Sequence, residues 1–320
     1  MTVSDFVARV RSHFPEGLTG IIGVGGTRTS FVLESGGVPG RALGAIDVAR
    51  YVEFASDRYL DLLRMFFDLG GQNLIVPVLS YQAFANERGP EYTREVTGFL
   101  RWLADEKFQK AYRELDVDPY FCGIDTLLHL PEDDPAHAIG RTLHDFRASW
   151  SDQPGRRKVI WEIAPIPLYS FWRAVADLDA DQRRAFDAEL ATVTNLDELY
   201  RRLFRFYAAS AFGTEIPVPH FYLGTNRNGD LKLRAPMSLS MLCGGGFRVF
   251  FTPYPTLFLT IDALRTIIED LMSGGGLRSF RKDYEGQYTE ELLRRERDRV
   301  FALRDDPRST VGLLRRIDAS

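Results

Sequence analysis

The sequence has few cysteines and no long apolar run. Its 320 residues include two cysteines, Cys122 and Cys243, each in an apolar stretch beside glycine. Two isolated thiols without metal-ligand spacing exclude a disulfide framework and are typical of reduced, buried cysteines in a cytosolic protein. No segment reaches the roughly 18 apolar residues of a membrane span, and the N-terminus lacks the apolar region of a signal peptide. We therefore expect a cytoplasmic protein without a membrane span.

Charge of either sign is not in large excess. The net charge is −4, so there is no overall attraction to nucleic acid or to an anionic membrane. Arg201, Arg202 and Arg205 fall on one predicted helix with aromatics between them, a pattern more typical of a solvated face than of a nucleic-acid interface. The sequence therefore predicts no nucleic-acid partner.

Metal-ligand spacing is also missing. The five histidines are scattered. The run from Asp177 to Asp181 resembles a metal cluster, but it precedes a predicted helix over 182–190, where acids cap the helix and complement its dipole. We favour capping, and no residue is predicted as a metal ligand.

Short apolar runs alternate with longer helical patterns, which predicts an α/β fold. Apolar residues recur at three- and four-residue steps over 47–69 and 196–212, so both segments are predicted helices. Runs that are apolar throughout suit strands buried on both faces by helices, as in a mostly parallel sheet of six strands. The predicted strands are 19–24, 74–79, 117–122, 159–163, 221–223 and 247–251.

A glycine turn follows the first predicted strand. It reads Gly23-Val24-Gly25-Gly26-Thr27-Arg28. Successive glycine amides can bind phosphate oxygens, while Thr27 adds a hydroxyl and Arg28 a forked cation. The third glycine of a dinucleotide-binding fingerprint would fall on Arg28, and no Walker lysine follows. Phosphate binding is favoured, with a nucleotide site and a plain tight turn as the alternatives.

Other polar residues follow the later strands. Ligands of open α/β sheets bind outside the carboxyl ends of the strands. Ser80 follows the second predicted strand, Asp125 lies just after the third, and Thr225-Asn226-Arg227 follows the fifth. We expect these residues to border the same ligand site as the glycine turn.

Taken in order, these blocks resemble the cis-prenyltransferase family, which includes undecaprenyl diphosphate synthase. The resemblance covers about residues 18–285 and depends on the order and spacing of the blocks rather than on any single one. It implies a cis-prenyltransferase-like fold and a prenyl diphosphate ligand. The matching blocks are Gly25–Ser30, Leu79-Ser80 with Asn86-Glu87-Arg88, Val117–Gly123, Pro219–Asn226 and Arg278–Arg281.

A closer resemblance is to diterpene synthases of the tuberculosinol/isotuberculosinol synthase type. Thr27-Arg28 match the loop of that group, and Tyr51 aligns with a tyrosine important to its catalysis. Such enzymes remove diphosphate from a diterpenyl diphosphate and quench the cation with water. The resemblance implies catalytic roles for Arg28 and Tyr51, although a core tyrosine on a helix face is an equal alternative for Tyr51.

Three departures from the family pattern bear on chemistry. The aspartate that engages Mg²⁺ and diphosphate is Gly25 here, and the arginine after Arg28 is Thr29. Any Mg²⁺ is therefore expected to be weakly held or bound through the substrate diphosphate. The arginine that binds isopentenyl diphosphate in elongating members is Gly224, which argues against chain elongation.

The sequence thus predicts a terpene synthase or diphosphate hydrolase that ionises an allylic C15–C20 prenyl diphosphate. The alternative is a non-catalytic subunit or a prenyl diphosphate-binding protein. We expect an N-terminal helix over 1–17, a catalytic domain over 18–285, a charged helical tail over 286–320, and a homodimer. Aromatic residues from Phe204 to Phe212 are expected in the pocket wall. The predicted substrate-binding residues are Gly25, Gly26, Thr27, Arg28, Ser80, Asn86, Arg88, Thr225, Asn226 and Arg227.

Overall fold

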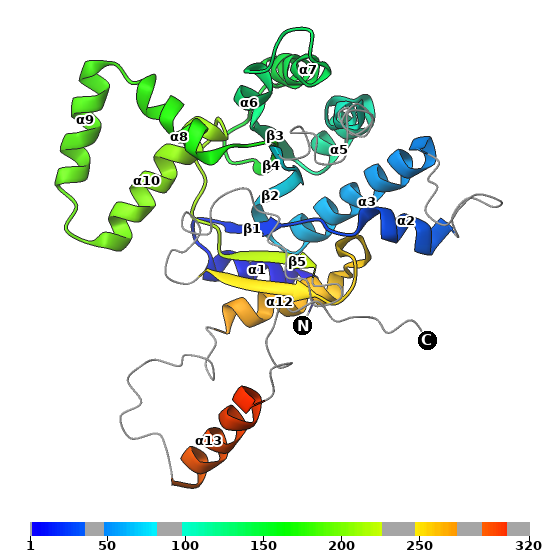
Figure 1. The fold of residues 1–320 in the computed structure, drawn as a ribbon, viewed down its shortest axis with the longest axis vertical. Helices are drawn as coiled ribbons and strands as arrows, with labels where there is room; N and C mark the ends of the chain where they lie inside the picture. Colours follow the sequence, from blue (N-terminus) through cyan, green and yellow to red (C-terminus); the bar gives the residue numbers. More distant parts are fainter. Residues whose placement is uncertain (1, 36–47, 82–97, 226–246, 274–289, 306–320) are drawn as a thin grey trace.

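Six parallel strands form the centre of the molecule. The computed structural model describes residues 2–35, 48–81, 98–225, 247–273 and 290–305. Every neighbouring pair of strands is parallel, in the order β3-β4-β2-β1-β5-β6 (Figure 1). The predicted α/β class is confirmed. The strands are β1 (Leu18–Ile22), β2 (Gly71–Leu79), β3 (Val117–Cys122), β4 (Arg157–Ile163), β5 (Phe221–Thr225) and β6 (Arg248–Thr252).

Helices surround this sheet, and their starts follow ordinary capping chemistry. Thr2 and Asp179 each form a capping box, and Asp134 precedes a proline in the first turn. The role predicted for the acids near Asp179 is therefore confirmed. The helices are α1 (Val3–His13), α2 (Thr27–Ser35), α3 (Val48–Asp68), α5 (Glu106–Glu114), α6 (Ile124–Leu128), α7 (Pro135–Ser149), α8 (Pro167–Ala176), α9 (Ala180–Ala191), α10 (Leu196–Ala211), α12 (Ile261–Met272) and α13 (Glu290–Asp305), with short 3-10 turns η2 (Leu100–Ala104) and η4 (Thr256–Phe258).

Side chains alternate between two cores along each strand. In β4, Val159 and Trp161 join one core, whereas Ile160 joins the other. The first core holds side chains from α1, α3, α5, α7 and α12, and the second holds side chains from α10. Because successive residues of a strand point to opposite faces, the two cores lie on opposite faces of the sheet. This burial on both faces explains the continuous apolar runs in the sequence.

The strand order reverses at β1. The chain passes from β1 to β2 on one side, and it later returns to place β5 on the other side. In open parallel sheets, the crevice at such a reversal is where ligands bind, outside the carboxyl ends of the strands. The glycine turn follows β1 directly and therefore lies at this position.

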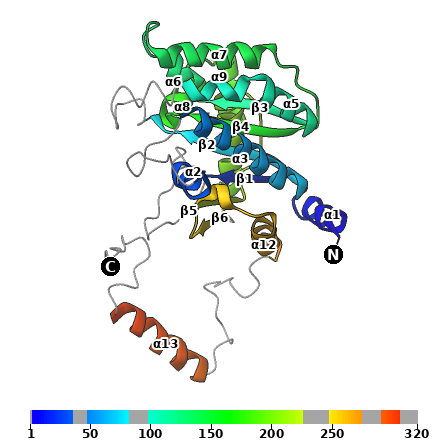
Figure 2. The same ribbon diagram turned by 90° about the vertical axis from the view of Figure 1, so that its right-hand side faces the viewer.

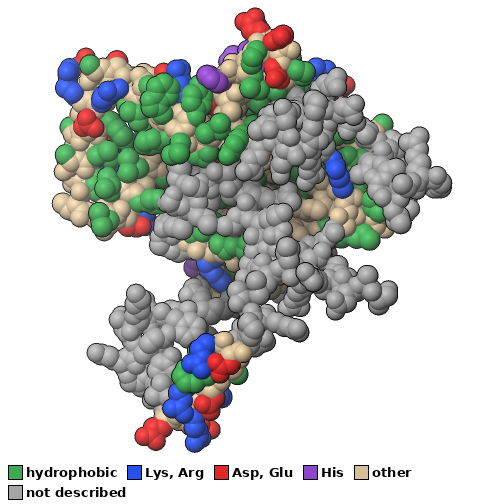
Figure 3. Space-filling model, viewed as in Figure 1, with side chains coloured by type: hydrophobic (Ala, Val, Ile, Leu, Met, Phe, Trp, Pro, Cys, Tyr) green, Lys and Arg blue, Asp and Glu red, His purple; other side chains and the backbone are tan. Residues whose placement is uncertain are grey.

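Helices α8, α9 and α10 form a lobe at one side of the sheet (Figure 1). Hydrophobic side chains gather over this lobe on the face drawn in Figure 3, and Leu168 and Trp172 of α8 are 82% and 60% exposed. Phe204, Tyr207 and Phe212 belong to the second core instead of a cavity wall. The expectation that residues 204–212 line the ligand pocket is wrong, because these side chains face the sheet surface opposite α3.

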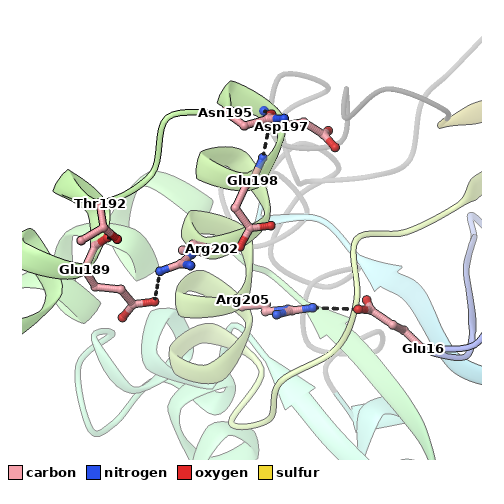
Figure 4. Close-up of polar contacts among 8 residues, drawn as sticks. All are labelled: Glu16, Glu189, Thr192, Asn195, Asp197, Glu198, Arg202 and Arg205. Atoms are coloured by element: carbon pink, nitrogen blue, oxygen red, sulfur yellow. Dashed lines mark hydrogen bonds and ion pairs between the residues drawn. The ribbon is translucent and has the colours of Figure 1, made fainter.

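The arginines of α10 are paired with acids. Arg202 lies 3.0 Å from Glu189 of α9 and 2.9 Å from Glu198, and Arg205 lies 3.0 Å from Glu16 in the loop before β1 (Figure 4). Arg201 pairs with Asp197 at 2.7 Å. These exposed pairs connect α10 with α9 and with the amino edge of the sheet, far from the glycine turn.

Helix α13 covers much of the predicted charged tail and lies apart from the sheet in both ribbon views (Figures 1 and 2). Among the described helices, none is both long and apolar enough to cross a bilayer.

Candidate functional site

The glycine turn is held from both sides. Gly23 donates its amide to the Leu223 carbonyl of β5 at 2.8 Å, and Gly26 has a φ of +75°, which favours glycine. The Gly26 carbonyl accepts the Ser30 amide at 2.9 Å, so α2 begins immediately after the turn. The first amides of a helix find no carbonyl within that helix, and its dipole is positive at this end. The start of α2, directly after the turn, therefore offers an anion both directed N–H groups and a favourable field.

A cavity of about 270 Å³ opens beside the turn. One side is formed by the glycine turn and the start of α2, and the rest is apolar and aromatic, contributed by α3, the end of β2 and η2. An anionic head at the turn would thus lie beside apolar and aromatic side chains that a hydrocarbon tail can contact. The lining residues are Val24, Gly26, Thr27, Arg28, Thr29, Tyr51, Val52, Ala55, Tyr59, Val78, Leu79, Phe99, Leu100 and Trp102.

Two of the predicted residues are in direct contact at the rim. The Thr27 hydroxyl and the Tyr51 hydroxyl lie 2.6 Å apart. Phe31 and Phe99 approach the Tyr51 ring edge-on, with centroid distances of 5.7 Å and 6.2 Å. Helix α3 thus holds the tyrosine between aromatic neighbours while its hydroxyl reaches the first residue of α2.

Arg28 lines the cavity from the first turn of α2 and is exposed. A guanidinium at a helix N-terminus adds its full charge to the partial charges of the backbone amides. An anion bound here would be neutralised by both. No acidic side chain belongs to the described lining of the cavity.

The remaining predicted residues divide into two groups. Ser80 directly follows β2, whose Leu79 lines the cavity, and Thr225 ends β5, where its hydroxyl lies 2.6 Å from the Thr256 hydroxyl. Both are therefore at the carboxyl edge of the sheet, although neither lines the cavity itself. The other four, Asn86, Arg88, Asn226 and Arg227, lie outside the described residues.

Sequence reasoning missed several residues of the site. Trp102 and Phe99 line the cavity from η2 and the residue before it, and Thr256 hydrogen-bonds to the glycine turn. The aromatics carried no motif, but a tryptophan in a short segment after the second predicted strand is a signal for a buried contact. Thr256 gave no local signal, because its partner Gly25 is 231 positions away.

The described donors do not suit Mg²⁺. Magnesium sites ordinarily take one or two carboxylates beside the phosphates. Glu34, the nearest acid after the turn, pairs with Arg58 at 2.7 Å, and Asp125 accepts a hydrogen bond from Ser170 at 3.1 Å. Within the described ranges, no group of three or more His, Cys, Asp or Glu side chains could hold a metal ion.

Gly224 has a packing reason for being glycine. A Cβ atom at this position would lie 2.6 Å from Cε1 of Tyr222, a side chain with no solvent exposure. A Cβ at Gly23 would lie 2.3 Å from the hydroxyl of the same tyrosine. The Tyr222 ring therefore occupies the volume that side chains at both glycines would need.

A buried carboxyl lies on the opposite face of the sheet. Glu162 of β4 has no solvent exposure, and neither of its oxygens has a hydrogen-bond partner among the described residues. Burial raises its pKa to about 8. Burial also raises the pKa values of the Cys122 thiol and the Tyr207 hydroxyl, and the charge of Glu162 and that of Asp125 reinforce both shifts.

Comparisons with known proteins add one structural likeness. No family model matches the sequence, and no curated protein matches it. Among solved structures, the chain is similar to a probable undecaprenyl diphosphate synthase from Campylobacter jejuni, with 13% sequence identity and a TM-score of 0.48. That likeness covers 80% of this chain and 94% of the other chain.

Proposed function

We propose that the protein is an enzyme that ionises an allylic C15–C20 prenyl diphosphate without elongating it. The observation that carries this proposal is the 2.6 Å contact between Thr27 and Tyr51, in a cavity with aromatic side chains and beside a glycine turn with Arg28. The three features are parts that such a reaction uses: an anion-binding turn, a hydroxyl pair and an aromatic wall beside the hydrocarbon.

The diphosphate would bind at the start of α2. The Gly26 and Thr27 region supplies backbone amides and a hydroxyl, and Arg28 supplies a cation that can bind two oxygens at once. In the reaction, the bond between the allylic carbon and the bridging oxygen breaks, and both electrons leave with the diphosphate. Groups that stabilise the extra charge on the leaving diphosphate lower the barrier of this step.

The carbon cation left behind would be held against the aromatic wall. The electron-rich faces of Tyr51 and its aromatic neighbours attract a positive charge. The cation then cyclises, loses a proton to give an alkene, or gains the oxygen of water and releases a proton to give an alcohol. The Thr27–Tyr51 hydroxyl pair lies where such a proton can be passed toward the departing diphosphate.

The volume of the cavity is close to the lower limit of ligand pockets. At about 270 Å³ it falls just below typical ligand pockets of roughly 300–1,000 Å³. Tyr59 and Trp102 line it and pack against each other at 5.1 Å, and both lie near the fully buried Trp161. We therefore expect these aromatic side chains to bound the hydrocarbon part of the substrate.

The absence of elongation is supported by Gly224. The resemblance to elongating enzymes assigns an arginine to this position for the second substrate, and the Tyr222 ring fills the space in which its side chain would start. Without that cation, isopentenyl diphosphate lacks its bidentate partner.

The test is incubation with geranyl, farnesyl, geranylgeranyl and copalyl diphosphates, with measurement of released pyrophosphate and of the organic products. We expect pyrophosphate release and a terpene hydrocarbon or alcohol with at least one of them. Binding of a non-hydrolysable farnesyl thiodiphosphate without turnover of any substrate would instead support the alternative of a binding protein or non-catalytic subunit. Failure to bind any of these molecules would contradict both.

A further inference from the structure

Thr256 bonds to the glycine turn through both its hydroxyl and its backbone amide. Its hydroxyl oxygen lies 3.2 Å from the Gly25 amide, 3.3 Å from the Gly23 carbonyl and 2.6 Å from the Thr225 hydroxyl. Its own amide donates to the Gly25 carbonyl at 3.1 Å. Both backbone polar groups of Gly25 are therefore bonded to one residue.

The hydroxyl of Thr256 can satisfy all three neighbours in one arrangement. A hydroxyl has one proton to donate and two lone pairs to accept with. It can donate only to the Gly23 carbonyl or to Thr225, and the Gly25 amide can only donate to it. All groups are satisfied when Thr256 donates to Gly23 and accepts from both Gly25 and Thr225. The one proton and both lone pairs of the Thr256 hydroxyl then take part in hydrogen bonds, and the proton points to the Gly23 carbonyl.

The segment that carries Thr256 supports the turn by packing as well. Thr256 has no solvent exposure, and a Cβ atom at Gly26 would lie 3.1 Å from Cβ of Pro255. Pro255 and Thr256 thus contact consecutive residues of the turn. The Thr256 hydroxyl therefore connects three segments: the carboxyl end of β1, the carboxyl end of β5 and the segment after β6.

We propose that Thr256 is the positioning residue of this site, because it fixes the glycine turn in the conformation from which the first amides of α2 are presented to an anion. The identity of the anion in this inference rests on the proposed function. The role of Thr256 in holding the turn does not. Thr256 does not line the cavity and is not expected to touch the substrate. Valine at this position keeps the shape and removes the hydroxyl, whereas serine keeps the hydroxyl.

The experiment compares wild type with Thr256→Val, Thr256→Ser and the control Thr266→Val, an exposed threonine on α12. Amide hydrogen exchange of peptides covering residues 20–30 is measured without ligand, and inorganic pyrophosphate affinity is measured by calorimetry. We expect Thr256→Val to accelerate exchange in these peptides and to weaken pyrophosphate binding by about tenfold. Thr256→Ser and Thr266→Val are expected to stay within about twofold of wild type, on the same measure of affinity.

Wild-type exchange and affinity in Thr256→Val would overturn the inference, as would equal losses in the serine variant. If wild type binds no pyrophosphate, the proposed function loses its diphosphate site, and the exchange measurement alone then decides whether Thr256 holds the turn. If the valine variant does not fold, Thr256→Ala replaces it, since alanine also removes the hydroxyl that bonds to Gly23 and Gly25. Unchanged exchange over 20–30 in that variant would also contradict the inference.

Discussion

Thr27 and Tyr51 come from different helices, and their hydroxyl groups meet at 2.6 Å. Thr27 is the first residue of α2, while Tyr51 lies in the first turn of α3. In a hydrogen bond between two hydroxyls, one group donates its proton, and the other keeps its own proton to donate to a further acceptor. The pair therefore connects the anion-binding end of the site with its aromatic wall.

Removing the hydroxyl of Thr27 or that of Tyr51 should slow the same proton-transfer step of the proposed reaction. We predict that Thr27→Val and Tyr51→Phe each reduce the single-turnover rate by roughly 10–100-fold, because each leaves the other hydroxyl without its partner. The double variant should be little worse than either single one, since residues that act together give non-additive losses. Tyr51→Ala, which also removes the ring, should be slower than Tyr51→Phe. Losses that multiply in the double variant would show that the two hydroxyls act separately.

Arg28 should be essential to turnover and dispensable for folding. It is exposed at the start of α2, so its loss removes charge without opening a cavity in the core. We predict that Arg28→Ala reduces kcat/KM by roughly 100-fold or more, with an unchanged thermal transition. Arg141→Ala, which removes an exposed arginine from α7, serves as the control. Turnover of Arg28→Ala at the wild-type rate would exclude the turn from the diphosphate site.

Dependence on Mg²⁺ should be weaker than in prenyl diphosphate enzymes that carry an aspartate in the loop after the first strand. Here the matching residue is Gly25, whose amide and carbonyl are both bonded to Thr256. A divalent ion held mainly by substrate oxygens is held weakly. We therefore predict residual turnover in EDTA and a broad response to added Mg²⁺. Complete loss in EDTA with recovery at micromolar Mg²⁺ would reveal a carboxylate site.

Glu162 should make stability fall as pH rises. Its ordinary pKa of 4.5 applies to the unfolded chain, and burial raises the folded value to about 8. Below pH 4.5 both states hold the proton, and between these values only the folded state does. At low pH the protonation of Glu162 therefore does not change the free energy of unfolding. As the pH rises above 4.5, the carboxyl ionises in the unfolded chain only, and this ionisation increasingly favours unfolding. The free energy of unfolding falls by at most about 1.4 kcal/mol per pH unit, and it stops falling above the pKa of the folded state.

This dependence can be isolated by substitution. Denaturant unfolding at pH 5, 6, 7, 8 and 9 should give a smaller decline for Glu162→Gln than for wild type, because glutamine has the shape of the neutral carboxyl and does not titrate. Exposed Glu132→Gln should decline as wild type does. Parallel curves for wild type and Glu162→Gln would mean that the Glu162 carboxyl titrates alike in both states.

The contact between Gly224 and Tyr222 should appear as a coupling energy. Gly224→Ala forces a methyl group against a buried ring, and we predict a loss of roughly 1–3 kcal/mol in the free energy of unfolding. In a Tyr222→Val background, the same substitution should cost much less. Gly98→Ala is the control, since nothing lies within 4 Å of a Cβ there. Equal costs in both backgrounds would contradict the steric explanation.

The fold was largely predictable, because burial on both faces leaves a simple signature. The run over 159–163 identified β4 even though it contains the charged Glu162, since its apolar neighbours outweigh one carboxylate. Boundaries were less certain, and β2 begins at Gly71, three residues before the predicted start.

The residues of the site were predictable only where they lie close together in the sequence. Gly25, Gly26, Thr27 and Arg28 are consecutive, so one turn reveals them together, and Tyr51 entered through a resemblance. Thr256 and Trp102 reach the site through tertiary packing, which no local pattern encodes. The same limit applies to the aromatics of 204–212, which were expected in a pocket wall: a helical period indicates that one side of a helix is buried, but not what it is buried against.

The ring of Tyr222 also constrains how this chain can change over generations. An arginine at position 224 cannot be accepted while the tyrosine remains, and a smaller residue at position 222 first leaves a hole in the core. A change at either position alone is therefore expected to destabilise the fold. The residue at position 222 thus decides which residues position 224 can accept, so we expect the two positions to change together.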